Sequence, residues 1–111
     1  MMMSNMNRNT GVKQWASVAY SPTAAGDEVA TVTLPGGQVG KPLVLRGSGS
    51  VSGEITLTYG NNAQIKVPVN PNAPYSETQI PASAFPNPTG SVTVTITADG
   101  AGTIRAYVGF N

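Results

Sequence analysis

The stretch that decides the fold is residues 51–69, VSGEITLTYGNNAQIKVPV. Apolar side chains alternate with polar ones in two arms, which are separated by the turn Gly60-Asn61-Asn62. Side chains on a strand point to opposite faces with a period of two, so each arm has one apolar face and one polar face. Gly and Asn tolerate the positive φ angles that a tight antiparallel reversal requires. The stretch therefore predicts a β-hairpin with one buried face, which needs a second layer to be stable.

The same alternation recurs along the chain, most clearly where Val and Ile alternate with Thr. Besides the hairpin, strands are expected at residues 13–20, 28–34, 42–46, 77–80, 91–98 and 103–110. The proline-containing residues 70–90 are expected to form a long crossing connection, which Greek-key and jelly-roll sandwiches contain. No stretch has a sustained helical period. We therefore predict an all-β protein, an antiparallel β-sandwich of seven or eight strands and of jelly-roll or Greek-key type.

The length of 111 residues fits one domain. Residues 1–12 are expected to form a polar N-terminal arm, and residues 13–111 the sandwich domain. Tyr59, Phe85 and Phe110 are predicted to belong to the core. Ala82 and Ala84 are predicted to tuck the crossing connection onto it. The last strand reaches the end of the chain, so we expect it to be held centrally or by a partner.

Charged residues make up only 10% of the chain, against about 25% in typical soluble domains. The net charge is +1, which offers little attraction to nucleic acid or to acidic lipid. The first nine residues lack the apolar core of a secretory signal, and no run approaches membrane-spanning length. We expect neither a nucleic-acid nor a membrane partner, and we expect the chain to stay where it is made unless it leaves within an assembly.

The chain contains no His and no Cys, which removes the commonest general base and the commonest metal ligands. Ser and Thr are plentiful, but no His is present to activate them. Residues 36–42 differ from a P-loop in spacing and precede a strand instead of a helix. We expect no catalytic residue, no cofactor and no metal site, hence a protein that is not an enzyme. Calcium bound by Asp27, Glu28 or Asp99 in a loop is the alternative.

Contact candidates are aromatic, methionine and arginine residues. Tyr107 is out of phase with the apolar residues of its strand and shares a face with Arg105, so this pair is the best exposed candidate. We expect Trp15 to cap one end of the sandwich, with a partner anchor as the alternative. Tyr20 and Tyr75 stay ambiguous. The arm adds Met1, Met2, Met3, Met6 and Arg8, which either pack into a partner's groove or reflect only the start of translation.

These features together suggest a family. In its small size, Thr-, Val- and Gly-rich β body, lack of Cys and His, missing signal peptide and polar arm, the chain resembles the decoration (cement or staple) proteins of tailed-bacteriophage heads. The resemblance is to the jelly-roll type of short-tailed phages, and it covers the whole chain through length, composition and strand pattern.

The resemblance implies a virion structural protein that is made in the host cytoplasm and binds the major capsid protein on the outer capsid surface. Such a protein bridges neighbouring capsomers and stabilises the shell against internal DNA pressure. The resemblance also implies a homo-oligomer, with a dimer favoured over a trimer. The alternative is a carbohydrate-binding or adhesin-like β-sandwich module on a phage or bacterial surface structure, in which exposed aromatic residues bind a glycan.

Overall fold

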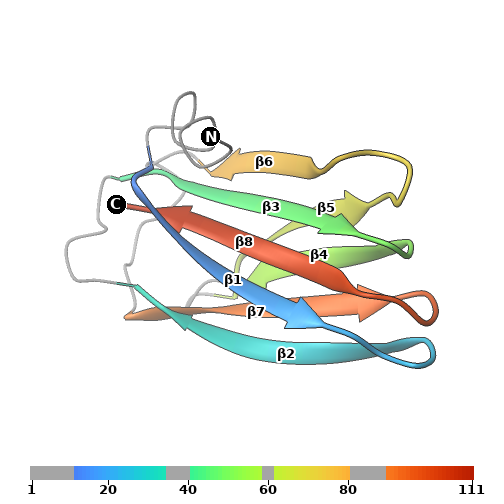
Figure 1. Ribbon diagram of the computed structural model, residues 1–111. Coiled ribbons are helices and arrows are strands. Elements are labelled where there is room, and N and C mark those ends of the chain that lie inside the picture. Colours follow the sequence, from blue (N-terminus) through green and yellow to red (C-terminus); the bar gives the residue numbers. More distant parts are fainter. Residues whose placement is uncertain (1–11, 35–40, 59–61, 81–89) are drawn as a thin grey trace.

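The computed structural model describes residues 12–34, 41–58, 62–80 and 90–111. Eight strands lie in these residues (Figure 1). They are β1 (Gln14–Tyr20), β2 (Gly26–Thr33), β3 (Leu43–Gly49), β4 (Gly53–Thr58), β5 (Gln64–Val69), β6 (Ser76–Ile80), β7 (Ser91–Ala98) and β8 (Ile104–Phe110). Within these ranges no helix is long and apolar enough to cross a membrane.

The strands form two four-stranded antiparallel sheets that face each other (Figure 1). One sheet has the order β1-β8-β3-β6 and is called the first sheet here; the other, the second sheet, has the order β2-β7-β4-β5. The chain passes repeatedly from one sheet to the other, and each sheet combines strands from both halves of the sequence. Two interleaved Greek keys of this kind make a jelly roll. The predicted β-sandwich is confirmed. Of the two predicted types, jelly roll and Greek key, the strand order is that of the jelly roll.

The core is the layer of aliphatic side chains between the sheets. In the predicted hairpin, β4 and β5 pair as expected, and Ile55, Leu57, Val67 and Val69 are buried. Asn62 in the turn has a φ of 68°, as the turn prediction requires. The buried apolar residues of the core are Val32, Leu34, Leu43, Leu45, Ile55, Leu57, Val67, Val69, Ile80, Val92, Val94, Ile96, Ala98, Ile104, Ala106, Val108 and Phe110.

The last strand, β8, lies between β1 and β3, so its central position is confirmed. Phe110 is buried, as predicted. The short strand near residue 80 is also confirmed, since β6 forms an edge of the first sheet. The core positions predicted for Tyr59, Ala82, Ala84 and Phe85 fall outside the described residues, as do Gly60 and Asn61 of the turn.

Several strand limits differ from the prediction by one to three residues, and two of the differences are informative. β3 continues through Gly47 to Gly49, whereas the sequence suggested an end at Arg46. A Cβ at Gly47 would lie 3.4 Å from Val69 Cγ2 and closer still to Ile55 Cδ1. Glycine therefore serves here to admit side chains of the opposite sheet, and it does not end the strand. Val51, which the pattern placed in the first arm of the hairpin, lies just before β4.

Replacing Gly47 with Ala should destabilise the sandwich, because the added methyl group enters space that Ile55 occupies. We expect the free energy of unfolding to fall by about 1–3 kcal/mol, the usual effect of overpacking. Chemical denaturation would measure it. Gly90→Ala is the matched control, since a Cβ there meets nothing within 4 Å. Equal stabilities for the two variants would contradict the tight fit at Gly47.

Candidate contact surface

The outer face of the first sheet carries aromatic and charged side chains in cross-strand rows. The strand register defines two complete rows and part of a third. They are Trp15–Gly109–Val44–Gln79, Ser17–Tyr107–Arg46–Glu77 and Ala19–Arg105–Ser48. Because neighbours in a row have Cβ atoms about 5 Å apart, long side chains in adjacent rows come into contact.

Gly109 allows Trp15 to reach across β8. A Cβ at Gly109 would lie 2.7 Å from Val12 Cγ2 and 3.0 Å from Trp15 Cη2, so both side chains lie directly over the glycine. Val12 is 1% exposed, and Val44 in the same row is fully buried. Apolar packing therefore extends onto the outer face of the sheet at this row. The indole ring leans from β1 toward β3, away from the free edge of the sheet.

Arg46 on β3 lies between two aromatic rings. Its Cζ is 4.8 Å from the centroid of the Trp15 ring and 4.5 Å from the centroid of the Tyr75 ring. Trp15 belongs to the preceding row, whereas Tyr75 comes just before β6, beyond the pair Gly47–Ser76. The two rings thus come from rows on either side of Arg46 and both contact its guanidinium. Arg46 is 7% exposed and is the one buried polar or charged residue among those described.

Glu77 completes this arrangement, which we call the Arg46 cluster (Trp15, Arg46, Tyr75 and Glu77). Glu77 lies directly opposite Arg46 on β6, and Arg46 Nε donates a hydrogen bond of 2.7 Å to its Oε1. The Nη2 group forms an ion pair with the same oxygen. A carboxylate and two ring faces offset the desolvation of the guanidinium. The result is a preassembled cluster of buried charge and aromatic surface, in which Tyr75 stays 51% exposed.

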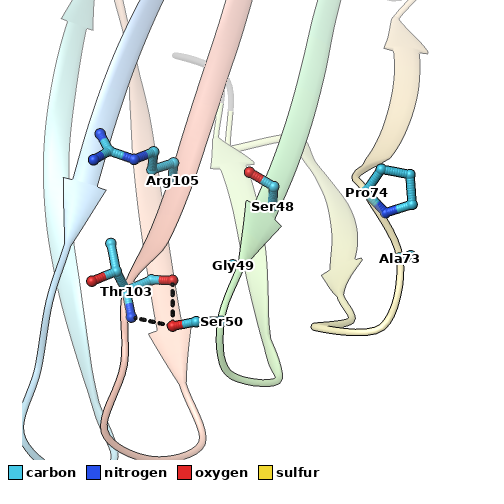
Figure 2. Close-up of a pocket in the computed structure, with 7 residues that line it drawn as sticks. All are labelled: Ser48, Gly49, Ser50, Ala73, Pro74, Thr103 and Arg105. Carbon is cyan, nitrogen blue, oxygen red and sulfur yellow. Dashed lines mark hydrogen bonds between the residues drawn. The ribbon is translucent and has the colours of Figure 1, made fainter.

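A shallow hollow of about 470 Å³ lies at the end of the first sheet where β6 begins, and its lining includes Pro74, the residue before Tyr75. Figure 2 shows its lining, which consists of Ser48, Gly49, Ser50, Ala73, Pro74, Thr103 and Arg105. Ser50 Oγ accepts a hydrogen bond of 3.0 Å from the Thr103 amide, so its position is fixed. In Figure 2 the guanidinium of Arg105 points toward β1, away from Pro74. The hollow is therefore lined by two serine side chains and the ring of Pro74 as well as by small residues and backbone.

The predicted contact residues have different outcomes. Arg105 is exposed and Tyr107 half-buried on the outer face of the first sheet, as their phase indicated. Trp15 does not cap an end of the sandwich; that interpretation was wrong, because Gly109 gives the ring room on the sheet face. Tyr20 packs against the core. Met1, Met2, Met3, Met6 and Arg8 lie outside the described residues.

Sequence reasoning missed the partnership of Arg46, Tyr75 and Glu77. The sequence did give one indication: Arg46 follows the apolar run Leu43-Val44-Leu45 in the same strand and alternates with Leu45, so its side chain is expected on the outer face. This alternation does not predict the strand order, which places β6 beside β3. Because Glu77 and Tyr75 come from a segment about thirty residues further along the chain, only the topology reveals the cluster.

Comparisons with known proteins give the fold and no family. No protein-family model and no curated protein sequence matches the chain. Among solved structures, TmCBM61 in complex with beta-1,4-galactotriose is similar, with 18% identity, a TM-score of 0.55, and coverage of 86% of this chain and 70% of that one.

Two further structures resemble the chain more weakly. PirA has 13% identity and a TM-score of 0.49 over 95% of this chain and all of that one. The family 11 carbohydrate-binding module of the cellulase Lic26A-Cel5E of Clostridium thermocellum has 10% identity and a TM-score of 0.39 over 93% of this chain and 91% of that one. The fold comparison therefore depends on TmCBM61, whose likeness at 18% identity shows a shared β-sandwich fold and no more.

Neutralising Glu77 should destabilise the protein, because the buried guanidinium of Arg46 then lacks its counter-charge. We expect Glu77→Gln to lower the free energy of unfolding by about 2 kcal/mol, less than for a fully buried pair because Glu77 keeps some solvent contact. Adding Arg46→Met should recover part of the loss, and a double-mutant cycle measures the coupling.

The exposed pair Lys66–Glu54, with 3.8 Å between Nζ and Oε1, provides the control for this experiment. Glu54→Gln is expected to change the stability by less than about 0.5 kcal/mol. Equal effects of Glu54→Gln and Glu77→Gln would show that the Arg46–Glu77 pair has no special importance.

Proposed function

We propose that the protein is a capsid decoration protein, which binds the outer surface of a viral shell through the outer face of its first sheet and bridges neighbouring capsomers. The observation that carries the proposal is the Arg46 cluster with its half-exposed tyrosine. The resemblance of the sequence to decoration proteins implies that the partner is the major capsid protein and that the protein lies on the outside of the virion. The proposed role involves no bond-making or bond-breaking step.

The chemistry of the cluster suits binding to another protein. Trp, Tyr and Arg are the residue types that contribute most to the affinity of protein interfaces. The ring contacts and the ion pair already hold Arg46, Trp15 and Tyr75 in place. Binding therefore orders few additional side chains, which lowers its entropic cost.

The small number of charged residues also suits binding to another protein surface. With six basic and five acidic residues in the whole chain, an approaching protein surface meets little long-range repulsion whatever its own charge. Lys66 and Glu54 lie on the second sheet, so this ion pair is remote from the proposed contact face. A rigid, weakly charged body of this kind fits a role that depends on shape and on many repeated contacts.

Two measurements test the shell role. Virions of the phage that encodes the chain should contain it in many copies when they are disrupted and analysed on a gel. Tyr75→Ala should weaken binding to heads stripped of the protein by about tenfold or more, as expected for a central interface tyrosine. Co-sedimentation of the labelled protein with the heads measures the affinity.

Val29→Ala is the matched control, because Val29 is 64% exposed on β2 of the other sheet. We expect this variant to bind like the unchanged protein. If binding survived Tyr75→Ala and were lost with Val29→Ala, the contact would lie on the second sheet. Absence of the chain from virions would remove the decoration role itself.

A second candidate function is glycan binding, which the hollow beside Tyr75 favours. Ser48 and Ser50 line the hollow together with Pro74, the residue that directly precedes Tyr75. Tyr75 contacts Arg46 and is still half exposed. An exposed aromatic residue together with a few hydrogen-bonding groups suits a neutral sugar. The fold shared with TmCBM61, a protein solved with a bound galactotriose, is compatible with this alternative.

An array of neutral oligosaccharides, with β-1,4-galactotriose included, tests the second candidate. Glycan binding predicts a signal that Tyr75→Ala abolishes and Val29→Ala preserves. An unchanged signal in the Tyr75→Ala variant would exclude the hollow as its source, and no signal from any sugar would remove glycan binding as a function.

A further inference from the structure

The four edge strands of the sandwich differ in how they are protected against pairing with another strand. β2 carries Asp27 and Glu28, and Glu28 has the inward phase, since it pairs with the buried Ile96. β5 contains Lys66 and Pro68, and proline lacks the amide that a ladder needs. β6 is only five residues long and contains Glu77. Charges, proline and short length are the usual devices that keep an edge from pairing.

β1 has none of these devices. Its seven residues, QWASVAY, include no charge, no proline and no glycine. In the described part of the chain β1 pairs with β8 alone, so its outer edge is an edge of the first sheet. Ser17 and Ala19 on this strand are exposed. The backbone of such a strand can accept another extended strand.

We propose that the edge of β1 pairs with β1 of a second copy of this chain, in antiparallel orientation about a two-fold axis at Ser17. Residue 17 is the midpoint of 14–20, so this register pairs all seven residues. Ser17 then lies opposite the partner's Ser17. Trp15 lies opposite the partner's Ala19, and Ala16 opposite the partner's Val18. Gln14 lies opposite the partner's Tyr20 at each end of the pair. Between these ends small residues are always present on at least one side, and no charges meet because β1 has none.

The strand suits a second copy because self-pairing demands that one sequence complement itself when reversed. Across a two-fold axis residue i lies opposite residue j and j opposite i, so only the residue on the axis meets its own copy, and a charge there would meet the same charge. β1 is uncharged along its whole length. The Trp15 ring leans over Gly109 toward β3, which leaves the free edge of the strand clear of the largest side chain.

The axis of such a pair is perpendicular to the sheet, because antiparallel neighbours keep the same faces on the same side. The first sheets of both copies join into one continuous sheet, with β6 at both outer ends. Both Arg46 clusters then face the same direction. This inference goes beyond the proposed function and does not depend on it, since the dimer forms in free solution without a shell.

Reciprocal charge changes at Ser17 test the dimer. We expect the unchanged full-length chain to sediment as a dimer. Ser17→Lys and Ser17→Asp should each weaken dimerisation by about tenfold or more, because two like charges then meet at the axis. An equimolar mixture of the two variants should restore a dimer, since Lys then meets Asp. Rescue by mixing requires that residue 17 faces its own copy.

A cysteine cross-link gives a second readout, because the natural chain has no cysteine. Under mild oxidation Ser17→Cys should form a disulfide-linked dimer. Thr31→Cys is the matched control, since Thr31 is an exposed, outward residue of the edge strand β2, and it should stay uncross-linked. A monomeric unchanged chain, as would result if the N-terminal residues covered β1, would overturn the proposal. A dimer that tolerates both charge changes would overturn it as well.

Discussion

The contact between the inner faces of the two sheets is the constraint on which the rest of the structure depends. Side chains alternate strictly along a strand, so a register shift of one residue would move every core residue to the surface. On β3, the same alternation that turns Leu43 and Leu45 inward turns Val44 and Arg46 outward. Packing of the core therefore also decides which residues lie on the outer faces of the sandwich.

An arginine at this outward position is buried by its neighbours on the sheet instead of by the core. Its planar guanidinium can contact two rings and still donate hydrogen bonds in its plane to Glu77. A lysine ammonium lacks this planar geometry. The surface thereby acquires an ordered patch of aromatic groups in a molecule whose other outward positions are mostly Thr, Ser, Asn and Gln. The patch is suited to binding mainly because its side chains are already held in place, and less because of its area.

Much of the fold follows from the sequence, because the period-two pattern is a local property. The hairpin of β4 and β5 and the alternation in 91–98 were predictable from neighbouring residues alone. Gly47 was misinterpreted, because a glycine that ends a strand and a glycine that admits Ile55 look the same in sequence. The site was largely beyond sequence reasoning: Trp15, Arg46 and Tyr75 meet only because β8 and β6 flank β3.

The proposed bridging role would place a geometric demand on a small sandwich. A body with a single contact face binds one site, and it joins two capsomers only if that face spans their junction or if the body is duplicated. Pairing through β1 would provide the duplication without using the face, because hydrogen bonds along a strand edge leave both surfaces of the sheet free. Two Arg46 clusters on one side of a rigid joined sheet would then bind with high effective concentration for the second contact. Modest affinity at each cluster would be sufficient under those conditions, which agrees with a chain that contains few charges.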